Sequence, residues 1–158
     1  MRQMKVDKLG IDLLTHDPVV NQKDMDGAHY LPILIGPFEA TAIALALEGA
    51  PVPRPLSHDL MRSILETLYA RLEQVVIHDI KDSTFLAKLV VRCDGDLSEI
   101  DARPSDAIAL ALRTQAPIFV SDKIVLEEAN SEKRPTNDNE VARFKKFLDD
   151  LKPSDFNR

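Results

Sequence analysis

The side chains best suited to acid–base or phosphate chemistry fall in three short segments, each at the start of an expected helix. These are residues 36–39 (GPFE), 54–59 (RPLSHD) and 101–106 (DARPSD). Carboxylate oxygens bind Mg²⁺ or Mn²⁺, guanidinium groups grip phosphate through paired hydrogen bonds, and an imidazole moves protons near neutral pH. If the three segments meet in the fold, they form a combined metal and phosphate site.

Each polar residue of these segments has a predicted role. The predicted catalytic residues are His58, as general acid or base, with Glu39, Asp59 and Asp106. The same three acids are the predicted ligands of a divalent ion, Mg²⁺ or Mn²⁺. The predicted phosphate-binding residues are Arg54, Arg103 and Ser105.

A structural explanation competes with the catalytic one. Glu39 and Asp106 each follow a proline by two residues, so both stand in the first turn of a helix, where an acid interacts favourably with the helix dipole and with free N–H groups. A histidine that opens a helix, such as His58, is often a surface or capping residue. Both explanations stay open for these residues.

The remaining histidines and the single cysteine are interpreted as structural. His16, His29 and His78 stand in strand or turn contexts and are expected to have no nearby partners. Cys93 lies near the end of a strand and has no histidine at a recognisable catalytic spacing. With one cysteine the chain has no Cys-based zinc site and no internal disulfide.

Composition is that of a globular domain with an acidic balance. The chain has 158 residues, 44% of them hydrophobic, and a formal net charge of −6. This charge disfavours long-range attraction to nucleic acid, so contacts with a phosphate chain would be local and made by a few arginines. No segment is long and apolar enough to span a membrane, and no secretion signal is evident, so a bacterial-type cytoplasm is expected.

A repeated hexapeptide indicates how the fold positions the polar segments. Residues 42–47 and 107–112 share the sequence AIALAL, and each copy follows a strand-like run and a proline. We interpret the copies as two strand–helix units whose nearly all-apolar helices are buried, and whose leading ends open onto one polar hollow.

The other elements follow from apolar periodicity and turn residues. Helices are expected at about 37–48, 58–72 with Ser57 as N-cap, 104–115, 123–129 and 140–151. Strands are expected at about 4–14, 19–23, 29–35, 75–80, 85–91, 97–102 and 118–120, with turns at 24–27, 81–83 and 94–96. The fold class is α+β with mixed or antiparallel sheets. Residues 1–130 form the domain, and 131–158 form a polar linker and a C-terminal amphipathic helix that docks on it.

Two motifs carry a resemblance to a known family. Residues 54–60 (RPLSHDL) and 101–113 (DARPSDAIALALR) resemble the bifunctional nuclease (BFN) domain family, formerly a domain of unknown function. The likeness extends over about residues 3–155. Family members often have an acid before the short helix that follows the Pro-Ile strand, where this chain has Ser121-Asp122-Lys123.

The resemblance implies a compact α+β domain that forms homo-oligomers, dimers or larger, and it implies cleavage of both RNA and DNA, an activity attributed to plant members. It supplies no catalytic residue assignment. The leading hypothesis is therefore a metal-dependent nuclease of low sequence specificity. The alternative is a non-enzymatic regulatory or assembly module that binds a small anionic ligand or a protein partner, which the acidic balance favours.

Overall fold

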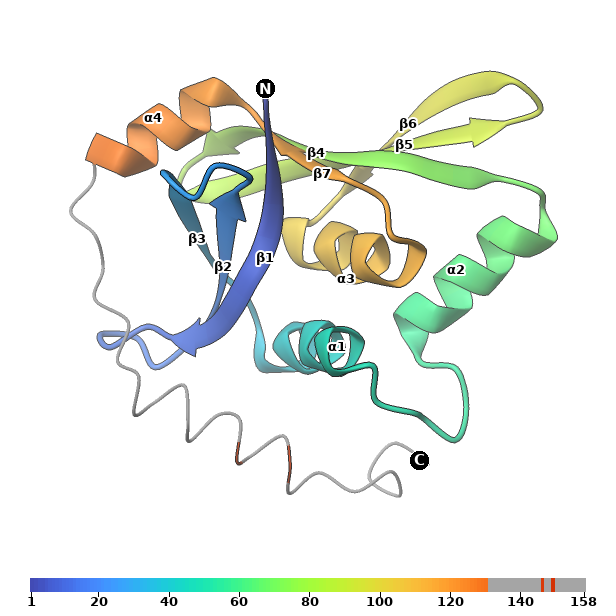
Figure 1. The fold of residues 1–158 in the computed structure, drawn as a ribbon, viewed down its shortest axis with the longest axis horizontal. Coiled ribbons are helices and arrows are strands. Elements are labelled where there is room, and N and C mark those ends of the chain that lie inside the picture. Colours follow the sequence, from blue (N-terminus) through green and yellow to red (C-terminus); the bar gives the residue numbers. More distant parts are fainter. Residues whose placement is uncertain (131–145, 147–148, 150–158) are drawn as a thin grey trace.

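The computed structural model describes residues 1–130 together with Lys146 and Asp149. Within residues 1–130 a single mixed sheet and four helices form an α+β domain, as the sequence predicts (Figure 1). The elements are β1 (Arg2–Ile11), β2 (Pro18–Asp24), β3 (Tyr30–Leu34), α1 (Pro37–Glu48), α2 (Ser57–Thr67), β4 (Arg71–Lys81), β5 (Thr84–Cys93), β6 (Asp96–Ala102), α3 (Pro104–Thr114), β7 (Ile118–Val120) and α4 (Asp122–Asn130).

The sheet contains two equivalent halves of three strands, with β7 between them. Its strand order is β3-β2-β1-β7-β4-β5-β6, and every pairing is antiparallel except that of β4 with β7. Each half is a three-stranded antiparallel meander whose last strand, β3 or β6, forms an edge of the sheet and leads into a helix, α1 or α3. The duplicated unit is therefore larger than the strand–helix pair that the sequence repeat predicts.

Tight turns set the register of the second meander, and they lie where the sequence predicts them. The loop between β4 and β5 is Asp82-Ser83, and the loop between β5 and β6 is Asp94-Gly95; all four residues have positive φ. Two-residue loops with positive φ at both positions match the right-handed twist of the strands they join. The 24–27 turn is confirmed too, with Gly27 at φ 77°.

The helical layer packs around α3. This helix lies against β4 and β5, while α1 and α2 pack on it (Figure 1). Residues 107–111 of α3 are all buried, whereas α1 buries only Ala40, Ile43 and Ala44 and leaves Leu47 exposed. Burial of both repeat helices is thus confirmed for α3 and wrong for the outer face of α1, because α1 packs on α3 with one side only.

α2 is shorter than predicted. It ends at Thr67 instead of residue 72, and its N-cap is Leu56, so Ser57 is the first helical residue and not the cap. Tyr69 has φ 56°, a left-handed conformation that ends the helix, and Arg71 already pairs with Arg92 of β5. Strand pairing therefore outweighs the helical periodicity of the sequence at this point.

The predicted C-terminal linker and helix, and the predicted absence of a membrane span, are the remaining expectations. The polar stretch 131–139 and the helix 140–151 lie outside the described residues, apart from Lys146 and Asp149. No helix in the described part of the chain has both the length and the hydropathy needed to cross a bilayer.

The core contains one polar side chain that should reduce stability. Gln22 of β2 is fully buried opposite Val6 and Leu31, and neither its amide nitrogen nor its amide oxygen has a hydrogen-bond partner among the described residues. Because burying an unpaired amide costs about 1–3 kcal/mol, we expect Gln22→Leu to raise the free energy of unfolding by that order. Urea denaturation measures this, with the half-buried Gln74→Leu as a control of small effect. A loss of stability in Gln22→Leu would contradict the expectation.

Candidate functional site

The helices α1 and α3 begin in the same way. Each has an extended N-cap residue, Gly36 or Arg103, and a proline at the first helical position. Proline suits that position because its fixed φ is helical and its missing N–H would have no helical partner. The third helical residue is then an acid in both, Glu39 in α1 and Asp106 in α3. These two acids are positional equivalents in the two halves of the domain.

Arg103 joins the two acids. Its Nη1 donates to Oε1 of Glu39 over 2.9 Å, and its Nε donates to Oδ2 of Asp106 over 2.9 Å. These contacts bring together the leading ends of α1 and α3, 64 residues apart in the chain. The Arg103 side chain is 64% exposed, and the two carboxylates raise the pKa of its guanidinium. Its Nη2 has no partner among the described residues, so this nitrogen can donate to a bound anion.

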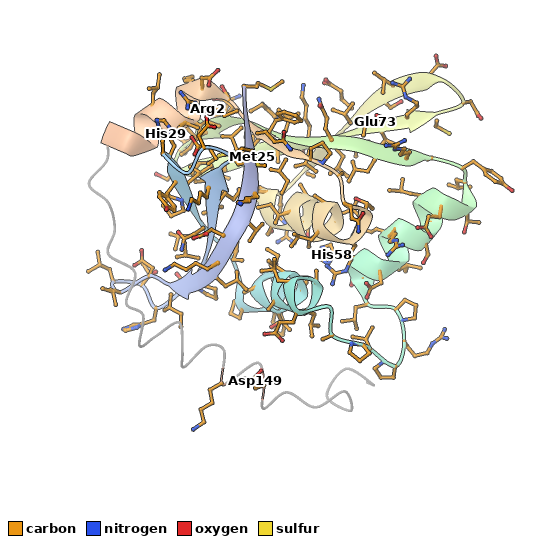
Figure 2. The ribbon with its side chains drawn as sticks, viewed as in Figure 1. Arg2, Met25, His29, His58, Glu73 and Asp149 are labelled. Atoms are coloured by element: carbon orange, nitrogen blue, oxygen red, sulfur yellow. The ribbon has the colours of Figure 1, made fainter. Side chains whose placement is uncertain are left out.

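His58 completes the cluster from a third helix. It lies near the start of α2, beside α3 (Figure 2), and its Nε2 is 2.9 Å from Oδ1 of Asp106. His58 is only 7% exposed and is the one buried residue of α2. We call Glu39, His58, Arg103 and Asp106 the helix-start cluster. Asp106 is its centre because one carboxylate oxygen binds His58 and the other binds Arg103.

The protonation of Asp106 fixes the role of the imidazole. Partial burial works to raise the pKa of Asp106, but hydrogen bonds from Arg103 and His58 outweigh it and hold that pKa below its ordinary value of 3.8. An ionised carboxylate only accepts hydrogen bonds, so His58 Nε2 carries a proton. In the neutral imidazole Nδ1 then holds the free lone pair. Nδ1 has no hydrogen-bond partner among the described residues.

Asp59 faces away from the cluster. Its Oδ2 accepts from the backbone N–H of Leu56 over 3.0 Å, and its Oδ1 accepts from Nε of Arg113 over 2.8 Å. The Arg113 side chain is 7% exposed and also donates to the carbonyl oxygens of Ala109 and Ala42. Arg113 therefore ties α3 to both α1 and α2. Arg113 is not among the site residues predicted from the sequence.

The structure thus brings together four of the seven predicted site residues. Ser105 is buried at the second position of α3. No hydrogen bond or ion pair among the described residues links Arg54 to the cluster; Arg54 is exposed and lines an open depression of about 280 Å³ beside Asp59 and Arg62. The described residues also contain no group of three or more His, Cys, Asp or Glu side chains placed to hold a metal ion.

A second polar cluster has no signal in the sequence. Asp24, buried at the end of β2, accepts from the backbone N–H groups of Ala28 and His29 and lies 2.7 Å from Nδ1 of His29. Arg2 contacts the same ring nitrogen over 3.1 Å, and both side chains are labelled in Figure 2. The interpretation of His29 as a residue without partners is therefore wrong. The 24–27 turn and the pairing of β1 with β2 bring these residues together.

Gly36 gives room to the Glu39 carboxylate. The backbone at Gly36 has φ −75°, which any residue adopts, but a Cβ there would overlap Oε2 of Glu39. We expect Gly36→Ala to displace this carboxylate and weaken its hydrogen bond to Arg103, at a cost of less than about 1 kcal/mol because Arg103 is exposed. Urea denaturation in a double-mutant cycle measures it. In the Glu39→Ala background Gly36→Ala should cause none of this loss; an equal loss in both backgrounds would show that the glycine acts elsewhere.

Comparison with known proteins adds independent matches. A protein-family model described as "Bifunctional nuclease domain" matches residues 20–133 of this chain, and these residues include the whole helix-start cluster. An uncharacterised protein of Mycobacterium tuberculosis is 37% identical over 164 residues, which cover 99% of this chain and 98% of that protein. Bifunctional nuclease 1 of Oryza sativa subsp. japonica is 24% identical over 128 residues, and bifunctional nuclease 2 of Arabidopsis thaliana is 24% identical over 109. These matches cover 79% and 67% of this chain but only 39% and 33% of the plant proteins.

Proposed function

This chain belongs to the bifunctional nuclease domain family, and from that premise we propose that it hydrolyses phosphodiester bonds of RNA and DNA with low sequence specificity. The observation that carries the proposal is the hydrogen-bonded series Glu39–Arg103–Asp106–His58, in which three helix starts combine an anion-binding group with a proton acceptor. The cytoplasmic location expected from the sequence belongs to the same proposal.

The base in this proposal is His58. DNA has no 2′-hydroxyl group, so an enzyme that cleaves both RNA and DNA by one route does not use that hydroxyl as the nucleophile, and the proposal assigns this role to water. Nδ1 of His58 accepts the proton of that water as its oxygen attacks phosphorus, while Asp106 holds the ring through Nε2 and stabilises the imidazolium that forms. The P–O bond to the leaving sugar oxygen breaks, that oxygen takes a proton from bulk water, and the imidazolium releases its proton to solvent. Asp106 is thus a positioning residue, since it acts on the reaction through His58.

The phosphate is bound by Arg103. Its Nη2 faces no described partner, so it can donate to a non-bridging phosphate oxygen and stabilise the charge that develops on phosphorus. Glu39 and Asp106 keep the guanidinium plane in one orientation through Nη1 and Nε. Arg54 extends the proposed phosphate contacts along the surface. Ser105 was predicted to bind phosphate as well, but it is buried at the second position of α3, so the proposal assigns it no contact.

A divalent ion fits the observed cluster poorly. Glu39 and Asp106 each bind Arg103, and Asp59 binds Arg113, so the three predicted ligands do not converge. To hold Mg²⁺ or Mn²⁺, the first two acids would have to release the arginine. No step of the proposed reaction is therefore assigned to a metal, and metal dependence is left to the assay.

One observation favours the alternative, a non-enzymatic module that binds an anionic ligand or a protein. Arg103 already has two carboxylate partners, which offset its positive charge and weaken its attraction for phosphate. In that case the helix-start cluster only holds the three helices together, and the protein catalyses no reaction.

The test uses the full chain with fluorescent single-stranded RNA and DNA, in Mg²⁺, in Mn²⁺ and in EDTA. The proposal expects product from both substrates, loss of product in His58→Ala, and normal product in His78→Ala, an exposed histidine of β4. Equal activity in both variants would identify a contaminating nuclease. No product, together with a rise in melting temperature when an oligonucleotide is added, would favour the binding module.

A further inference from the structure

The open depression beside Arg54 has the size and the lining of a ligand site. It has a volume of about 280 Å³, and its lining comes from α2 and from the loop that joins α1 to α2 (Figure 1). Clefts that bind small molecules start at about 300 Å³, so the depression has room for one group of nucleotide size. We call it the α2 depression.

The loop side of the α2 depression is apolar and stiff. It is formed by Val52, Pro53 and Pro55. A proline ring fixes its own φ and restricts the residue before it to extended conformations, so Arg54, between two prolines, has few backbone conformations available. Such preorganisation lowers the entropy that is lost when a ligand binds. The ring of a base or sugar can bury its apolar surface against this wall.

The helix side of the α2 depression is polar, and its charges are already paired. Asp59 accepts from Nε of Arg113, and Arg62 pairs with Glu66 over 2.9 Å. Arg54 is exposed and forms no hydrogen bond or ion pair within the described part of the chain. The lining therefore carries one charge that no neighbour offsets, and that charge is positive.

Arg54 and Ser63 together suit a phosphate group. A guanidinium donates paired hydrogen bonds to phosphate oxygens, and a serine hydroxyl donates one more. The hydroxyl of Ser63, which also lines the depression, makes no hydrogen bond to any residue that the structure describes. The α2 depression thus combines donors for a phosphate with an apolar wall for a ring, and a nucleotide has both of these parts.

The α2 depression lies next to the helix-start cluster. Asp59 lines the depression, and His58, the residue before it, faces Asp106 of the cluster. Neighbouring residues of a helix point about 100° apart, so the two sites lie on adjacent sides of the first turn of α2. A nucleic acid strand that crosses the start of α2 therefore reaches both.

We propose that the α2 depression binds one nucleotide of a single-stranded nucleic acid, the nucleotide next to the phosphate held by Arg103. This inference rests on the proposed nuclease function and adds a substrate class to it. A base within a duplex is paired and stacked, so only an unpaired base reaches the wall of Val52, Pro53 and Pro55. The wall offers no hydrogen-bonding side chain to a base edge, which agrees with low sequence specificity.

The first test measures the binding of AMP, adenosine and inorganic phosphate to the full chain by isothermal titration calorimetry. AMP should bind, and adenosine and phosphate should each bind at least tenfold more weakly, because each lacks one set of contacts. Arg54→Ala should weaken AMP binding at least tenfold, and Ser63→Ala should weaken it less. Circular dichroism confirms that each variant is folded.

Arg71→Ala is the matched control, because it removes an exposed arginine of β4 that does not line the depression. It should leave AMP binding unchanged. Equal losses in the two arginine variants would mean that overall charge attracts AMP, and the inference would be abandoned. Absence of AMP binding to the wild-type chain would overturn it as well.

The second test compares a short fluorescent single-stranded DNA with a duplex of the same sequence, by anisotropy, in the His58→Ala background. The single strand should bind at least tenfold more tightly, and Arg54→Ala should reduce this preference. Equal affinity for the two forms would contradict the inference. AMP binding without single-strand binding would make a free nucleotide the ligand, which also overturns it.

Neither measurement uses turnover, so the two proposals fail separately. If single strands bind through Arg54 but the wild-type chain yields no product, the α2 depression is supported and the nuclease activity is refuted. If the chain cleaves RNA and DNA but Arg54→Ala binds AMP as well as wild type does, the nuclease activity is supported and the α2 depression is refuted.

Discussion

Asp106→Asn is expected to lower nuclease turnover by about 100-fold or more, the range seen when general acid–base catalysis is impaired. The amide keeps the shape of the side chain but removes the charge that holds His58 Nε2–H and Arg103 Nε–H together. The base is then free to take the other tautomer, and the arginine loses its closest restraint. Initial rates on single-stranded RNA and DNA measure the effect.

Asp122→Asn is the matched control. Asp122 is also an acid in the first turn of a helix, α4, and it also pairs with an arginine, Arg2. Turnover of this variant should equal that of wild type. Equal losses in the two variants would mean that the charge at helix starts acts through stability alone, and the catalytic role of Asp106 would be abandoned.

Acid should remove the contribution of Asp106 to stability. Its pKa in the folded protein lies below 3.8, the value expected for the unfolded chain, so the folded state favours the ionised form. This contribution is fully present above pH 3.8 and is lost as the pH falls through the lower, folded-state pKa. The difference in unfolding free energy between wild type and Asp106→Asn should therefore shrink in that acid range.

Arg113→Met is expected to cost about 3 kcal/mol of unfolding free energy. The buried guanidinium holds Asp59 of α2 and the carbonyl of Ala42 in α1, and breaking a buried pair leaves groups without their partner. Asp59 keeps the N–H of Leu56 and some exposure to water, which sets the cost near the low end for such pairs. Urea denaturation measures it.

Arg62→Met is the control for this substitution. Arg62 belongs to α2 and forms an exposed pair with Glu66 one turn away, which is worth at most about 0.5 kcal/mol. A loss of similar size in both arginine variants would show that Arg113 contributes no more than a surface charge. A loss confined to Arg113→Met would confirm that it fastens the three helices.

Elements with strong local signals could be predicted from the sequence. The bounds of α1 are as predicted, because a proline marks its start and Gly49 follows its end. A proline also marks the start of α3, whose predicted end differs by one residue because Gln115 is not helical but left-handed. The hairpin turns are fixed by short-range chemistry as well. The end of α2 was not predictable in this way, since it depends on Arg71 pairing with a strand that is about twenty residues further along the chain.

The candidate site was predictable only in part. Glu39, His58, Arg103 and Asp106 meet as the repeat predicts, but Asp59 does not join them. Adjacent residues of a helix point about 100° apart, so when His58 faces Asp106 its neighbour must face another direction. Asp59 instead contacts Arg113, which is 54 residues away in the sequence, and no local pattern predicts this contact.

The doubled meander makes Glu39 and Asp106 counterparts related by an approximate internal symmetry. Two identical halves would give both acids the same neighbours. α2 follows the meander and helix of the first half only, and its imidazole reaches Asp106 and not Glu39. A single inserted helix thus makes the two matching carboxylates different: only the carboxylate of the second half has an imidazole beside it, so the junction between the halves is asymmetric.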